Sequence, residues 1–169
     1  MRTTFPTSGQ HAILDSPDVT GATHAVPPPV GKGKRLVNLL VDYGVRFALG
    51  NALVTSATWL LGGEALAVAA NWIYQLLPTS ELTVPLAYGC LVEFAYYACC
   101  EGGANGRTLG KLLTGTRAVR DDGEAFTIRD AIKRSLWRLA PLETVTFLVE
   151  GNSGWHDERT GTRVVDVRG

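Results

Sequence analysis

The chain has 169 residues, the size of a single domain, and its 16 Lys and Arg balance its 16 Asp and Glu. This balance argues against a nucleic-acid-binding protein, because such proteins normally carry a basic excess. Hydrophobic residues make up 46% of the chain, which excludes disorder throughout, and three Cys are too few for the disulfide framework of a small secreted domain.

The uneven distribution of basic residues indicates a membrane protein. No Lys or Arg occurs between Phe47 and Gly106, although 16 of the 169 residues are basic. Before this region, residues 1–34 are rich in Pro, Gly, Ser and Thr and lack an apolar segment, so we expect a disordered cytoplasmic tail and no signal peptide.

Two segments predict membrane-spanning helices. Residues 36–61 would form a helix of about 39 Å, long enough to cross a hydrocarbon core of about 30 Å. Residues 82–100 form the second predicted span, with Glu93 as its one charged residue. Between them, residues 64–81 have a short apolar middle and predict an interfacial helix or hairpin on the far side.

Basic residues return after the second span and place the following loop in the cytoplasm by the positive-inside rule. They are Arg107, Lys111, Arg117, Arg120, Arg129, Lys133, Arg134 and Arg138. A basic cluster at Lys32, Lys34 and Arg35 precedes the first span. The pattern predicts a multi-pass protein of the cell membrane with a cytoplasmic N-terminus.

A third helical segment is amphipathic. Ile128, Ile132, Leu136 and Leu139 recur at helical spacing with basic residues between them, which favours a helix lying in the inner interface. We expect it to continue past Pro141 as a re-entrant or shallow helix covering about 128–149. A full third span, which would put the C-terminus outside, remains the competing topology.

Residues 114–119 and 160–165 are nearly the same hexapeptide, each beginning Thr-Gly-Thr-Arg. Both alternate and end in β-branched residues, so we predict that 113–119 pairs with 160–166 as a small β element at the cytoplasmic face. The alternative is a coincidence between two loops. The predicted fold class is therefore an all-α membrane protein with two transmembrane helices, an interfacial helix and this β pairing.

The first predicted span carries a polar stripe. Arg35, Asn38, Asp42 and Arg46 fall within an arc of about 80° on a helix. On antiparallel spans, Arg46 and Glu93 would lie at almost the same depth, so we predict a buried charge cluster of Asp42, Arg46 and Glu93. Such a cluster either fixes the register of the helices or marks an ion-binding or transport pathway.

Three segments together resemble the RDD family of bacterial membrane proteins: Arg-Leu-Val-Asn-Leu-Leu-Val-Asp at 35–42, the segment 106–117, and Gly-Trp-His-Asp-Glu-Arg-Thr-Gly-Thr at 154–162. The resemblance covers about 34–166, so we expect one RDD-like membrane domain at 35–166. Transport, including sodium–proton exchange, has been proposed for some members, but the molecular function of the family is largely undefined.

The resemblance implies site residues. Arg35, Asp42 and Asp157 would be the hallmark arginine and aspartates, and Glu101 falls where many members carry an acidic residue. The middle segment adds the basic residues Arg107 and Lys111. Arg46 and Glu93 do not belong to the family pattern, so any role for them is specific to this chain.

No motif predicts catalysis. The segment 105–112 lacks the first Gly and the Ser or Thr of a phosphate-binding loop, and His156 and Asp157 are expected to form a hydrogen-bonded turn. We interpret Cys99 and Cys100 as apolar fillers, with palmitoylation or redox chemistry as the alternative. We therefore expect no enzyme activity, no cofactor and no metal site.

Two functions remain open. The first is a subunit of an ion or small-solute transporter, built from several copies because two spans enclose too little volume for a pathway. The alternative is a non-transporting membrane scaffold or accessory protein whose basic face binds anionic lipid or a partner protein. The expected partners are the lipid bilayer and further copies of the chain or other membrane proteins, with no nucleic acid.

Overall fold

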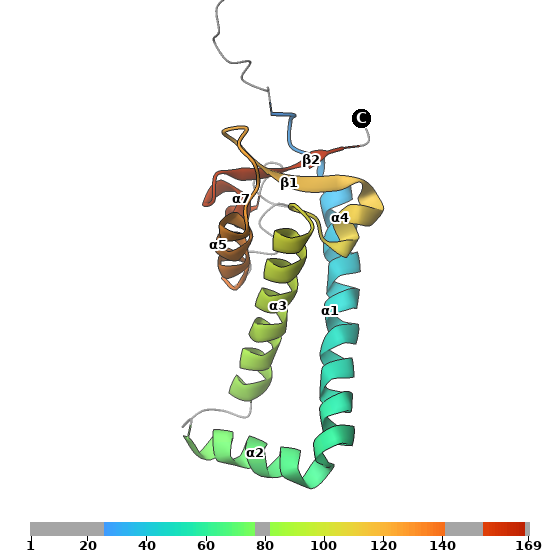
Figure 1. The fold of residues 1–169 in the computed structure, drawn as a ribbon, viewed down its shortest axis with the longest axis vertical. Helices are drawn as coiled ribbons and strands as arrows, with labels where there is room; N and C mark the ends of the chain where they lie inside the picture. The colour runs from blue at the N-terminus through green and yellow to red at the C-terminus, as the bar shows by residue number, and fades with distance from the viewer. Residues whose placement is uncertain (1–25, 77–81, 141–153, 168–169) are drawn as a thin grey trace, which may run out of the picture.

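The computed structural model describes residues 26–76, 82–140 and 154–167. Two long helices lie side by side and carry a small cap of short elements at one end, while a further helix lies across the opposite end (Figure 1). The elements in chain order are α1 (Lys32–Leu61), α2 (Gly63–Leu76), α3 (Thr83–Gly103), α4 (Leu109–Thr114), β1 (Thr116–Arg120), α5 (Ile128–Arg138), α7 (Trp155–Glu158) and β2 (Thr162–Asp166).

Helices α1, α2 and α3 correspond to the first predicted span, the predicted interfacial helix and the second predicted span. Helix α1 ends at Leu61. The next residue, Gly62, has a φ of 81°, a backbone conformation that glycine adopts readily and other residues rarely do. The chain then bends by 114° into α2. Among the helices of the described residues, α3 is the one that is long and apolar enough by itself to cross a membrane, and α1 and α2 meet the requirement together as a bent pair.

The two long helices bury polar residues and expose apolar ones. The buried residues of α1 are Arg35, Asn38, Asp42 and Gly50, whereas Trp59 is 85% exposed and Leu60 is 83% exposed. Likewise, α3 buries Glu101 and exposes its leucines. In water this arrangement would expose a large apolar surface, which soluble monomers rarely do. The pattern is that of helices whose outer face meets an apolar solvent.

The cap contains a two-stranded sheet that matches the predicted pairing. Strands β1 and β2 are antiparallel, with Ala118 opposite Val164 at the centre. The two similar hexapeptides also share local geometry, since Gly115 and Gly161 have positive φ values of 70° and 61°. The repeated Thr-Gly-Thr therefore encodes the same turn before each strand.

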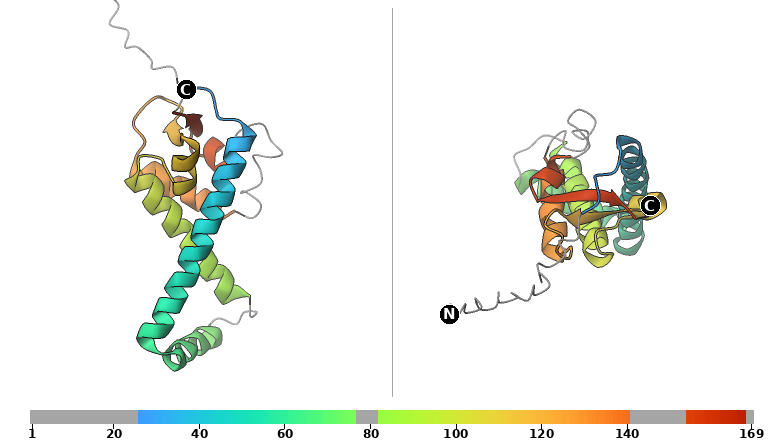
Figure 2. Two further views of the ribbon diagram at one scale, coloured as in Figure 1. Left: turned by 90° about the vertical axis from the view of Figure 1, so that its right-hand side faces the viewer. Right: turned by 90° about the horizontal axis from the view of Figure 1, so that it is seen from above.

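Helix α5 packs along α3, and α4 packs along α1 (Figures 1 and 2). Helix α5 begins with a capping box between Thr127 and Asp130 and ends at Arg138, so the described helix is shorter than the predicted 128–149. Residues 141–153 lie outside the described residues, as does the choice between a re-entrant segment and a third span.

Residues before position 35 are part of the described structure. Helix α1 starts at Lys32, and the backbone N–H of the buried Val30 donates to Val164 O at 2.8 Å. The last residues of the predicted tail thus extend along β2, because the edge of a two-stranded sheet offers unpaired carbonyl groups. The predicted disorder of residues 1–25 lies outside the described part of the chain.

Candidate functional site

Asp157, on the short helix α7, is one centre of a buried ionic network. Its Oδ2 accepts from Arg35 Nη1 of α1 at 2.6 Å, and its Oδ1 accepts from Arg134 Nη1 of α5 at 2.6 Å. The side chains of Asp157 and Arg134 have no exposed area. Arg35 and Asp157, two of the residues that the family resemblance singles out, are therefore in direct contact.

Glu101, at the end of α3, is the second centre. It forms ion pairs with Lys111 Nζ at 2.5 Å, with Arg134 Nε at 2.9 Å and with Arg138 Nη2 at 3.0 Å. Arg134 thus bridges both buried carboxylates, and the network joins α1, α3, α4, α5 and α7. Four cations share two carboxylates, so each buried charge has at least one partner of opposite sign that offsets part of its desolvation cost.

Burial and neighbouring charges shift the pKa values of residues in the network. Burial by itself would raise the pKa of Asp157, but the adjacent His156, Arg134 and Arg35 outweigh it and hold that pKa well below its usual range. For Lys111, burial lowers the pKa to about 8; Arg134 and Arg138 act in the same direction, and Glu101 opposes them. Asp157 is therefore ionised throughout the physiological range.

Asp42 lies in a separate hydrogen-bonded site. Its carboxylate accepts from Tyr96 Oη at 2.7 Å, Thr108 Oγ1 at 2.7 Å and the backbone N–H of Gly110 at 2.8 Å. The prediction that Asp42 joins a cluster with Arg46 and Glu93 is wrong, because the Asp42 carboxylate faces the start of α4.

Gly110 makes this close approach possible. A Cβ there would lie 2.6 Å from Asn38 O and 3.0 Å from Asp42 Oδ1. Beside it, Asn38 Nδ2 donates to Thr116 Oγ1 at 3.0 Å, and Thr114 Oγ1 donates to Asn38 Oδ1 at 2.5 Å. The N-terminal half of the polar stripe therefore docks α4 and the start of β1 on α1.

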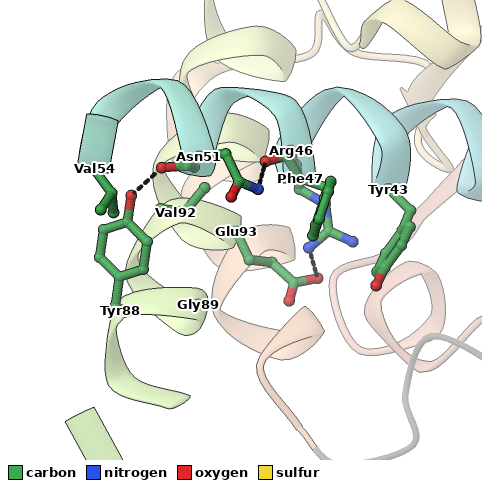
Figure 3. A pocket seen from close by; sticks show the side chains of 10 residues that line it. Tyr43, Arg46, Phe47, Asn51, Val54, Tyr88, Gly89, Val92 and Glu93 are labelled. Carbon is green, nitrogen blue, oxygen red and sulfur yellow. Dashed lines mark hydrogen bonds and ion pairs between the residues drawn. The ribbon is translucent and has the colours of Figure 1, made fainter. Parts of the chain in front are cut away.

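Arg46 and Glu93 do meet, and they line a cavity between α1 and α3 (Figure 3). Arg46 Nη1 lies 3.0 Å from Glu93 Oε1. The cavity has a volume of about 280 Å³ and is otherwise lined by uncharged residues, which are Tyr43, Phe47, Gly50, Asn51, Val54, Tyr88, Gly89 and Val92. One charge pair thus lies in a mainly apolar pocket.

The remaining predicted residue, Arg107, is half-buried and lines a separate cavity of about 220 Å³ with Lys111, Gly115 and Thr116. Sequence reasoning missed Arg134, Arg138, Tyr96 and Thr108. The sequence places Arg134 only among the basic residues that mark a cytoplasmic loop, and the one signal for its burial is the need of Glu101 and Asp157 for a cation. Within the described ranges, no group of three His, Cys, Asp or Glu could hold a metal ion.

Residues 29–155 match the model of the RDD family. The chain belongs to the RDD family. RDD proteins are typically membrane proteins, in agreement with the exposed apolar faces of α1 and α3. The match ends before Asp157, so the importance of that aspartate in this RDD protein rests on its contacts with Arg35 and Arg134. No curated protein and no solved structure matches the chain.

Proposed function

We propose that this RDD protein is a multi-pass protein of the cell membrane, with its N-terminus in the cytoplasm, that forms a subunit of an ion or small-solute transporter. The observation that carries the proposal is the Arg46–Glu93 pair in the cavity between α1 and α3. Arg46 follows Arg35 by eleven residues, which is about 16 Å along a helix, so the pair would lie near the middle of a bilayer that α1 enters at Arg35.

Charges at this depth are costly and in membrane proteins usually mark a pathway for ions or solutes. The buried ionic network around Asp157 and Glu101 includes neither Arg46 nor Glu93. Its two carboxylates are instead paired with four other basic residues, which are Arg35, Lys111, Arg134 and Arg138. The described residues of one copy hold too few helices that could span a membrane to enclose a pathway, so we propose that several copies assemble around it.

A scaffold without transport is the second candidate. The buried ionic network favours this candidate, because its pair Arg35–Asp157 connects the cap to α1 and so has a structural role. In this case the pair Arg46–Glu93 would serve only to align the two helices.

Measurement of solute flux across the membrane of reconstituted vesicles decides between the transporter and the scaffold. We expect the purified protein to move a small ion or solute faster than protein-free vesicles do, and Glu93→Gln to remove most of this flux. Glu64→Gln is the matched control, because Glu64 is an exposed acid at the start of α2. An absence of flux for Na⁺, K⁺, H⁺, Cl⁻ and small organic solutes from monodisperse protein would reject the transporter and favour the scaffold.

The topology has its own test. In a variant without the three native cysteines, we expect a single Cys at Glu64 to react with an impermeant maleimide from outside intact cells. A single Cys at Asp122, in the turn after β1, should react only after permeabilisation. Labelling of both positions from the same side would contradict the proposed orientation.

A further inference from the structure

The cavity between α1 and α3 also indicates what kind of solute it would hold. We propose that it binds a small amino-acid zwitterion, with the carboxylate at Arg46 and the ammonium at Glu93. This inference rests on the proposed function for transport, but the binding itself can be tested separately. Its basis is the charge, the unused hydrogen-bonding capacity and the size of the cavity.

Charge is the first argument. Arg46 and Glu93 are the charged residues among those that line the cavity, so its formal charge is zero. A bound cation would compete with Arg46 for Glu93 and leave the half-buried guanidinium without its carboxylate, and a bound anion would do the reverse. A charge that is removed from water without a partner of opposite sign is unfavourable. A zwitterion avoids this cost because it offers a partner to both residues when the pair opens.

Hydrogen-bonding capacity is the second argument. Arg46 Nε is buried and has no hydrogen-bond partner, although Nη1 of the same group faces Glu93. Nitrogens of Arg35, Arg117 and Arg134 are unsatisfied in the same way, so what distinguishes Arg46 is the place of its guanidinium beside the cavity, where a guanidinium edge suits the two oxygens of a carboxylate. Asn51 lies one turn further along α1 in the wall of the cavity (Figure 3). Its Nδ2 donates to Phe47 O at 2.7 Å, which leaves the amide oxygen as an acceptor for an ammonium group.

Size and wall chemistry form the third argument. A volume of about 280 Å³ is at the lower end for ligand pockets and suits a small solute. The walls at Phe47, Val54 and Val92 are apolar, and the ring of Tyr88 is held by a hydrogen bond from its Oη to Gly50 O at 2.8 Å. Such walls favour an amino acid with an aliphatic side chain, and aromatic rings also attract an ammonium group.

Equilibrium binding to the full chain in lipid nanodiscs tests the proposal with three molecules of related skeleton. L-Leucine carries both charges, 4-methylpentanoate lacks the ammonium, and 3-methylbutylamine lacks the carboxylate. We expect leucine to bind saturably and the two truncated molecules to bind at least tenfold more weakly. Equal binding of all three, or no saturable binding of leucine, alanine or glycine, would overturn the proposal.

Variants locate the site. Gly89→Leu should abolish leucine binding by filling the cavity, and it should fold because a Cβ at Gly89 meets no atom within 4 Å. Gly44→Leu is the matched control, since Gly44 is equally open but does not line the cavity. We expect Arg46→Gln and Glu93→Gln each to weaken binding at least tenfold. Unchanged binding by Gly89→Leu would refute this location.

The outcomes separate the two proposals. Leucine binding that is lost in Gly89→Leu, together with an absence of leucine flux, would support the site and reject the transporter. Conversely, ion flux without binding of any of the amino acids would reject the zwitterion site and leave the transporter standing.

Discussion

Asp157→Asn tests the buried ionic network most directly. The substitution keeps the shape of the side chain but removes the charge that lies 2.6 Å from both Arg35 Nη1 and Arg134 Nη1. Removing one member of a buried ion pair costs about 3–5 kcal/mol, because the remaining charge stays desolvated without its partner. For a chain of this length, each kcal/mol lowers the melting temperature by about 2–4 °C, so we expect a decrease of about 6–20 °C.

The assay is thermal unfolding of the full chain in detergent at pH 7, followed by tryptophan fluorescence. Asp122→Asn serves as the control, because Asp122 pairs with Arg120 at the surface, and we expect no resolvable change. In the Asp157→Asn background, Arg134→Met should cost less than in the wild type, since part of its interaction is already lost. A melting temperature of Asp157→Asn within about 2 °C of the wild type would refute the reasoning.

Three further predictions concern packing, hydrogen bonding and pH. Gly110→Ala should lower the free energy of unfolding by about 1–3 kcal/mol, because its Cβ would meet the backbone of α1, whereas Gly44→Ala should not lower it; urea unfolding of both variants checks this. Asp42→Asn should cost about 1–3 kcal/mol in the same measurement, because an amide cannot accept from all three donors that surround the carboxylate. Stability should fall as the pH drops below about 4, because the depressed pKa of Asp157 means that the unfolded chain binds the proton first. This slope should be smaller in Asp157→Asn, and an equal slope would assign the acid sensitivity to other groups.

The sequence was sufficient to predict the arrangement along the chain. The helices at 36–61 and 82–100 follow from hydropathy and length, and the pairing of the two Thr-Gly-Thr-Arg segments follows from their repetition. The meeting of Arg46 and Glu93 was also predictable, because a constant rise per residue determines the depth of each side chain in antiparallel helices.

The partners of Asp42 were not predictable in this way. Helical periodicity places Asp42 and Arg46 on one stripe, but the stripe is wide enough to face two neighbours. In the structure, Asp42 faces the Thr108–Gly110 segment before and within α4, and Arg46 faces α3. The direction in which α4 packs on α1 depends on Gly110, whose effect appears only when the two backbones are brought together.

The sequence by itself determined the helical segments and the RDD family. It also determined which polar residues lie in apolar segments and therefore need a polar partner. Only the tertiary structure decided that Arg134 bridges Glu101 and Asp157, and that Gly89 and Gly50 leave a cavity beside Arg46. The physical reason is that depth and periodicity are local properties of a helix. The choice of an ionic partner and the volume left between helices depend on how segments distant in the chain pack against one another.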